Sequence, residues 1–142
     1  MTPGKLKMSG MILFLLGLLT GLMIMFLKNP RMGLAAHLEG VFNGVFLVVA
    51  GIIWDEIKVS ARLKMLCWVS LLYGTFANWF FTLLSAIWGT SKMTPLSGSG
   101  YSGSTFQESV ISAGLISVAI TMIFSLVVII YGLREKVSRS SQ

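Results

Sequence analysis

The stretch NPRMGLAAHLEGVFNG, residues 29–44, begins an apolar run that continues to Trp54. It contains the only histidine of the chain, His37, together with Glu39 and Asn43. A charged side chain at the centre of a bilayer costs about 2.5–3.5 kcal/mol on insertion scales, so ionisable groups at that depth are functional candidates by default. Whether this stretch lies in a membrane depends on the rest of the chain.

The overall composition is that of a membrane protein. Hydrophobic residues make up 55% of the 142 residues and charged residues only 11%, and the mean hydropathy is +0.84. Soluble domains carry about 25% charged residues. The net charge of +6 comes from basic residues at the ends of apolar runs, a pattern that indicates membrane topology rather than a nucleic-acid surface. The single cysteine, Cys67, excludes an intramolecular disulfide framework and is expected to be a small apolar filler in a helix.

Four apolar runs predict four membrane-spanning helices in a single domain, residues 1–142, with spans at about residues 8–27, 32–54, 63–90 and 106–133. Each reaches or exceeds the ~20 residues that a helix needs to cross ~30 Å of hydrocarbon. The first run is longer than the apolar part of a signal peptide, and no small-residue cleavage site follows it, so it is expected to be retained. The alternating ~10-residue segments of a membrane β-barrel are absent. The expected fold is an all-α membrane protein, a four-transmembrane-helix bundle.

The basic residues predict the orientation of these spans. One side of the membrane collects eight of them: Lys5, Lys7, Lys58, Arg62, Lys64, Arg134, Lys136 and Arg139. The other side has only Lys28, Arg31 and Lys92. Basic residues concentrate on the cytoplasmic side, so both termini are expected to be cytoplasmic.

The only long loop is predicted at residues 91–105, a segment rich in glycine and serine. It is either a plain flexible linker, the preferred interpretation, or a lid over a site. A capping box of Ser104 with Gln107, or of Thr105 with Glu108, is expected to begin the fourth helix.

The second span has two distinct polar or small-residue faces. His37, Gly40, Gly44 and Gly51 share one face at 100° per residue. Gly40 and Gly44 form a G-x-x-x-G pattern, which lets another helix or a flat cofactor approach the backbone closely; plain helix packing is the simpler interpretation.

Glu39 and Asn43 share a different face, displaced from His37 by roughly 140°. No single pocket in a monomer uses both faces easily, whereas in a ring of identical subunits one subunit's front meets its neighbour's back. An ion pair of Glu39 with Arg31 or another basic residue is left open.

The third span carries a polar group of its own. Gly74, Thr75 and Asn78 are neighbours on the helix surface, with Tyr73 on the flank. Asn78 either contributes to a site or simply bonds a neighbouring helix, which is worth roughly 0.6 kcal/mol.

These motifs resemble the hydroxylaminobenzene mutases, which look related to the small membrane-bound styrene oxide isomerases. The resemblance spans all four predicted helices and rests on NPRMGL at 29–34, H-x-E-G at 37–40, NG at 43–44, YGT at 73–75, ANW at 77–79, QE at 107–108 and YGLR at 131–134. It implies a homotrimer in a bacterial inner (cell) membrane, with haem b at the subunit interfaces. It also implies that a histidine ligates the iron and that an asparagine six residues later lies in the substrate pocket, a spacing that His37 and Asn43 match.

The expected function is therefore a haem-dependent rearrangement of an aryl hydroxylamine to a 2-aminophenol, in which ferric iron acts as a Lewis acid. His37 is the expected iron ligand, with Gly40 and Gly44 beside the cofactor. Asn43, Asn78, Glu39 and Tyr73 are the expected catalytic candidates, Tyr73 because it is the tyrosine well inside the third span. The alternatives are an epoxide isomerase giving an aldehyde and, from other classes, a haem-bearing electron carrier or a small multidrug exporter. The exporters resemble a dimer with an acidic residue inside the first span, which residues 8–27 lack.

Overall fold

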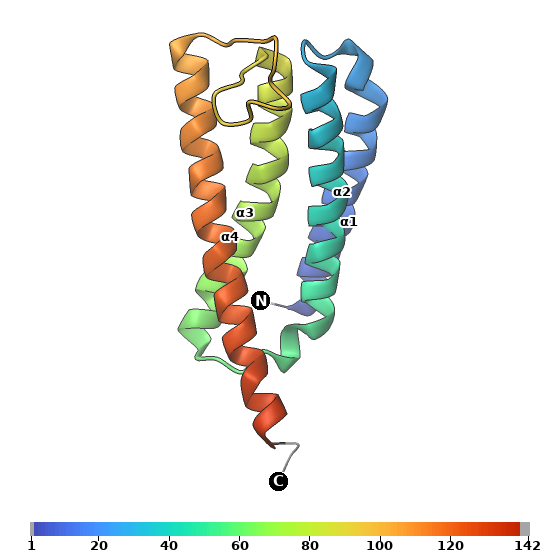
Figure 1. Ribbon diagram of the computed structural model, residues 1–142. Coiled ribbons are helices and arrows are strands. Elements are labelled where there is room, and N and C mark those ends of the chain that lie inside the picture. Colours follow the sequence, from blue (N-terminus) through green and yellow to red (C-terminus); the bar gives the residue numbers. More distant parts are fainter. Residues whose placement is uncertain (1, 140–142) are drawn as a thin grey trace.

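The computed structural model describes residues 2–139, and the four predicted spans are its four α-helices (Figure 1). They are α1 (Pro3–Met23), α2 (Pro30–Ile53), α3 (Ala61–Trp88) and α4 (Thr105–Arg139). Short 3-10 turns at Ile24–Phe26 and Trp54–Glu56 follow α1 and α2. Each helix is long and apolar enough to cross a membrane, and no described residue forms a strand, which confirms the all-α prediction. Met1 and residues 140–142 of the predicted domain lie outside the described part.

Local capping chemistry explains where the helices begin and end. α2 begins at Pro30 because the Asn29 side chain accepts hydrogen bonds from the backbone N–H groups of Arg31 (3.1 Å) and Met32 (3.2 Å). α3 ends at Trp88, two residues before the predicted end of the span. Gly89 adopts a left-handed conformation (φ 71°) and its N–H bonds the carbonyl oxygen of Ser85, which terminates the helix.

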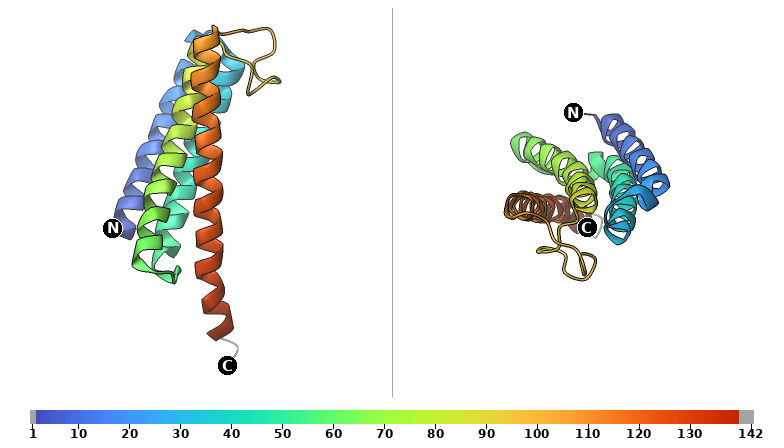
Figure 2. Two further views of the ribbon diagram at one scale, coloured as in Figure 1. Left: turned by 90° about the vertical axis from the view of Figure 1, so that its left-hand side faces the viewer. Right: turned by 90° about the horizontal axis from the view of Figure 1, so that it is seen from above.

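The helices form two antiparallel pairs, α1 with α2 and α3 with α4, joined by contacts between α2 and α3 (Figure 2). The start of α1 and the end of α4 lie at the same end of the bundle (Figure 1). The turn between α1 and α2 lies at the other end, beside the loop between α3 and α4. The basic residues of the spans and turns are therefore separated between the two ends as predicted, while the cytoplasmic placement of one end stays a prediction.

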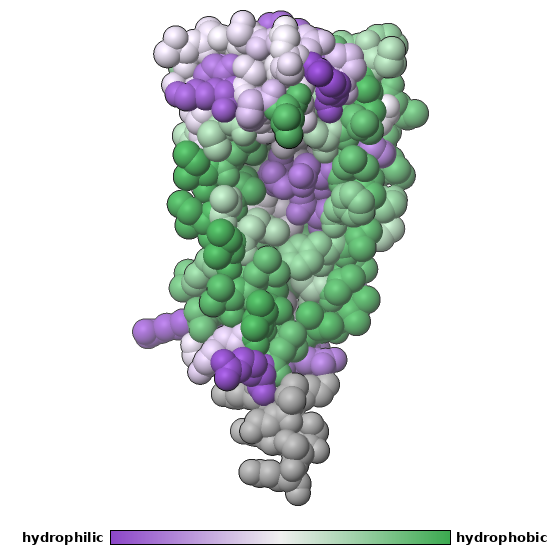
Figure 3. All heavy atoms as spheres, in the orientation of Figure 1, coloured by the Kyte–Doolittle hydropathy of each residue, from purple (hydrophilic) through white to green (hydrophobic). Residues whose placement is uncertain are grey.

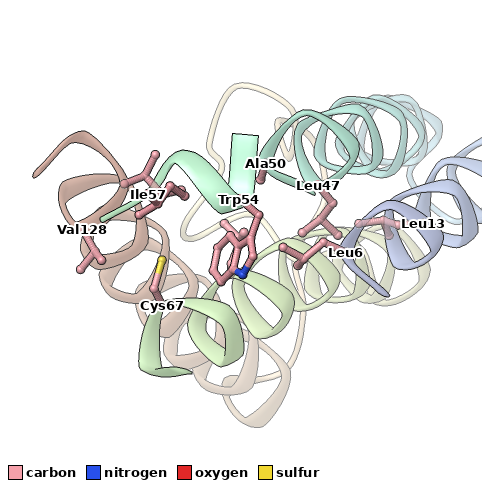
Figure 4. Close-up of a cluster of buried hydrophobic side chains, with 10 residues drawn as sticks. Leu6, Leu13, Leu47, Ala50, Trp54, Ile57, Cys67 and Val128 are labelled. Carbon is pink, nitrogen blue, oxygen red and sulfur yellow. The ribbon is translucent and has the colours of Figure 1, made fainter. Parts of the chain in front are cut away.

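A buried hydrophobic cluster holds the two helix pairs together near the end that carries the termini (Figure 4). Trp54 lies at its centre in Figure 4, and all four helices contribute: Leu6, Leu13, Leu47, Ala50, Ile57, Cys67, Leu71, Val128 and Ile129. Cys67 is fully buried, in agreement with its predicted role as a filler. Much of the remaining apolar surface faces outward as a continuous band (Figure 3), as lipid contact requires.

The loop between α3 and α4 is anchored at several points, unlike the plain flexible linker that its glycine and serine content predicts. The Glu108 carboxylate accepts hydrogen bonds from the backbone N–H groups of Ser91 (3.0 Å), Lys92 (3.0 Å) and Gly103 (3.1 Å). The capping box of α4 is therefore the one between Ser104 and Gln107, and the alternative box of Thr105 with Glu108 is wrong.

The same loop is also attached to the beginning of α2. The buried Asn29 amide donates to the carbonyl oxygen of Ser97 (2.9 Å), and the Arg31 guanidinium donates to that of Ser99. Arg31 also lies over the ring of Tyr101, 5.9 Å from its centroid. The ion pair left open between Arg31 and Glu39 is therefore absent, because the loop occupies Arg31.

Candidate active site

His37 projects from α2 towards α1, where its imidazole has a fixed orientation. Nδ1 lies 2.8 Å from the carbonyl oxygen of Gly17. A carbonyl oxygen only accepts, so Nδ1 is the donor, and in the neutral imidazole, the form that ligates metals, Nε2 carries the lone pair. A histidine that donates one ring N–H to a backbone carbonyl is the usual arrangement of a metal-ligating imidazole. The geometry thus leaves Nε2 available as a ligand.

Two glycines of α1 that are not among the predicted site residues lie at this contact: Gly21 makes room for the imidazole, and Gly17 makes room for the α2 backbone. A Cβ atom on Gly21 would lie 2.8 Å from Nδ1 of His37, and one on Gly17 would lie 2.6 Å from the backbone nitrogen of Val41. The signal was present in the sequence, because Gly17 and Gly21 form a G-x-x-x-G pattern in the first span.

Gly40 and Gly44 face α1 of the same chain. A Cβ on Gly40 would lie 2.5 Å from Cα of Gly17, and one on Gly44 would lie 2.6 Å from the backbone nitrogen of Phe14. The predicted close approach is confirmed, and the partner is a helix. Both glycines are buried in this contact, so the structure favours helix packing over the predicted cofactor contact.

Glu39, Asn43 and Asn78 form a hydrogen-bonded cluster between α2 and α3. One carboxylate oxygen of Glu39, Oε2, accepts from the amide nitrogen of Asn43 (2.9 Å) and from that of Asn78 (2.5 Å). Figure 3 shows a hydrophilic patch within the apolar band, between α2 and the α3–α4 pair. The structure therefore brings together three of the four predicted catalytic candidates at membrane depth.

His37 and this cluster face different sides of α2 within one chain. His37 contacts α1, whereas Glu39 is hydrogen-bonded to Asn78 of α3. This agrees with the two faces predicted from helical periodicity. Within one chain, the structure does not bring the two groups together.

Tyr73 does not join the cluster. Its side chain is 45% exposed, and its hydroxyl lies 2.7 Å from Oγ of Ser117 on α4. Its neighbour Gly74 packs against Met122 of α4, so this part of α3 is turned towards α4. Within one subunit, the structure gives no support for Tyr73 as a catalytic partner of Glu39, Asn43 and Asn78.

Four spanning helices with an oriented imidazole and a carboxylate–amide cluster at membrane depth describe a small integral-membrane protein with a candidate site for polar chemistry. Residues 3–134 match the family model of the styrene oxide isomerases, and the chain belongs to this family. It is similar to two proteins of Ectopseudomonas oleovorans. Hydroxylaminobenzene mutase HabB is 39% identical over 136 residues, which cover 95% of this chain and 83% of the relative. Hydroxylaminobenzene mutase HabA is 36% identical over 126 residues, which cover 88% and 93%.

These similarities support an isomerase of the mutase type, and neither an exporter nor an electron carrier. No solved structure matches the chain.

Proposed function

We propose that this protein rearranges aryl hydroxylamines to 2-aminophenols inside the membrane. The N–O bond breaks and a C–O bond forms at the ortho ring carbon; the C–H bond at that carbon breaks, and a proton is gained by the nitrogen, which becomes an amino group. The molecular formula is unchanged, so no reductant or oxidant is consumed. The observation that carries the proposal is the Glu39–Asn43–Asn78 cluster, a set of hydrogen-bonding groups at membrane depth in a chain similar to two mutases.

The chemistry of His37 fits haem b as the cofactor. Among residues 2–139, no group of three or more His, Cys, Asp and Glu side chains is placed to hold a metal ion. A lone imidazole suits an iron whose other ligands come from a porphyrin, and the bond to Gly17 leaves Nε2 as the ligand atom. Bound ferric haem would supply a Lewis acid for the departing oxygen.

The protein itself binds and orients the substrate. The amides of Asn43 and Asn78 hydrogen-bond the hydroxylamine group, and the surrounding apolar helices exclude water, which strengthens these bonds. An aromatic substrate partitions into the bilayer and enters from the lipid.

A homotrimer places both groups in one site. His37 faces the α1 side of its subunit and the polar cluster faces the α3 side. In a closed ring, the His37 side of one subunit meets the cluster side of the next, with one haem at each interface. The distribution of basic residues supports cytoplasmic termini in this assembly, and we propose a bacterial inner membrane as its location.

An epoxide isomerase is the second candidate function, because the matching family model describes styrene oxide isomerases. The same Lewis-acid chemistry would open an aryl epoxide and give an aldehyde.

The proposal can be tested by measuring the absorption spectrum and the substrate conversion of one preparation of detergent-purified protein. We expect a haem Soret band and conversion of phenylhydroxylamine to 2-aminophenol without added reductant. Styrene oxide is supplied in a parallel reaction. Absence of the band, or turnover of styrene oxide alone, contradicts the proposal.

A further inference from the structure

We propose that Glu39 is a positioning residue that fixes the orientation of the Asn43 and Asn78 amides. The site then offers the substrate two carbonyl oxygens as hydrogen-bond acceptors and favours substrates that carry hydrogen-bond donors. This inference rests on the proposed function and assigns the residue that determines its substrate preference.

The argument begins with the shared oxygen atom. Oε2 of Glu39 lies 2.9 Å from Nδ2 of Asn43 and 2.5 Å from Nδ2 of Asn78. Oε2 accepts both hydrogen bonds, so each amide turns its nitrogen towards Glu39 and its carbonyl oxygen away. One carboxylate on α2 therefore sets the rotation of two amides on two different helices.

The two carbonyl oxygens are then left for a ligand. Among the described residues, neither Oδ1 of Asn43 nor Oδ1 of Asn78 has a hydrogen-bond partner. Asn43 is only 7% exposed, so water has little access to its amide. Each amide nitrogen keeps a second N–H, and the carbonyl oxygen is the only acceptor that each amide presents.

The substrates of the two candidate functions differ in their hydrogen-bond donors. An aryl hydroxylamine has N–H and O–H donors, whereas an epoxide has only an acceptor oxygen. A site at membrane depth whose acceptors have no partner of their own discriminates against a ligand that lacks the matching donor, because the acceptors are then left unpaired. The Glu39 arrangement thus favours hydroxylamines over epoxides on a shared four-helix framework.

The experiment compares phenylhydroxylamine with N-methyl-N-phenylhydroxylamine, which keeps the N–O bond and the ortho carbon and lacks the N–H donor. For the full-length haem-loaded protein, we expect a preference for the parent compound of roughly 10- to 100-fold in kcat/KM, the usual effect of one unpaired buried group. In Glu39→Gln, the new amide donates as well as accepts hydrogen bonds. The side-chain amide of one asparagine can then rotate by about 180° and point its nitrogen, rather than its oxygen, at the substrate. The preference should fall by about fivefold or more.

The matched control is Glu108→Gln, the same change at the carboxylate that binds the loop backbone. It should change kcat/KM for both compounds by the same factor. If Glu39→Gln does not fold, Glu39→Asp provides the same test, because its carboxylate is one carbon too short to reach both amides.

The outcomes separate the two proposals. Equal losses on both compounds in the Glu39 variants, or no preference in the wild-type protein, would overturn the role of Glu39 and leave the mutase function standing. A wild-type protein that converts neither compound would overturn both.

Discussion

The imidazole Nδ1 of His37 and the carbonyl oxygen of Gly17 lie 2.8 Å apart across the contact between α1 and α2. The same contact contains Gly21, whose missing side chain leaves room for the ring. The tautomer of the proposed iron ligand is therefore coupled to the packing of two helices. Changes on α1, away from the histidine, should affect the cofactor.

Replacing the histidine tests the ligand directly. His37→Ala should abolish the Soret band of the purified protein and reduce the conversion of phenylhydroxylamine to background, because His37 is the proposed iron ligand and the single histidine of the sequence. Added imidazole should restore part of the absorption by occupying the vacated space. Full haem retention with normal turnover would remove His37 from the site.

Gly21 provides a second test of the same geometry. Gly21→Ala places a Cβ atom 2.8 Å from Nδ1 of His37, and the ring must move. We expect haem affinity to fall by about 10- to 100-fold, as for other residues that orient a ligating histidine. The measurement is haem titration of the apoprotein.

The control for this change is Gly4→Ala, also on α1, where a Cβ atom would meet nothing within 4 Å. It should leave haem affinity unchanged. Equal affinities for the two variants would show that the Gly21 side of α1 does not position His37.

Gly44→Leu tests the glycine face. Its Cβ would lie 2.6 Å from the backbone nitrogen of Phe14, and backbone atoms of a packed helix cannot give way easily. Overpacking of this kind destabilises by about 1–3 kcal/mol, so the thermal midpoint in detergent should fall and assembly should weaken. Val45→Leu on the exposed side of α2 is the control and should unfold like wild type. A Gly44→Leu protein that assembles with its full haem content would contradict the packing.

Asn43 and His37 face different sides of α2, which permits a complementation experiment. Asn43→Ala should keep haem and lower turnover by about 10²–10³, the usual effect of removing one preorganised hydrogen-bonding group. When His37→Ala and Asn43→Ala chains are co-expressed, some interfaces of a mixed trimer pair an intact His37 with an intact Asn43. Activity should then partly return.

Two differently tagged chains, purified through both tags, make this experiment decisive. Mixed assemblies that form and remain inactive would show that the two residues do not act across an interface. Recovery in an assembly other than a trimer would correct the number of subunits and keep the shared site.

The sequence alone determined the number of helices, their approximate bounds and the separation of the faces of α2. Each of these follows from a local rule. Apolar runs must reach the thickness of a bilayer, helical periodicity places His37 and Glu39 on different faces, and the Ser104–Gln107 box is a contact within one turn. Such interactions lie within a few residues and can be recognised without knowing how the helices pack.

Only the tertiary structure decided which helix each face contacts, and therefore which residues each motif packs against or hydrogen-bonds. The glycines at 40 and 44 pack against α1, Tyr73 turns to Ser117, and Glu108 holds the loop. The amide of Asn78 meets a carboxylate 39 residues away, and Gly17 accepts from a histidine 20 residues away. These partners belong to different helices, and only the crossing of packed helices brings them within hydrogen-bonding distance, since periodicity specifies the direction of a side chain and not its neighbour.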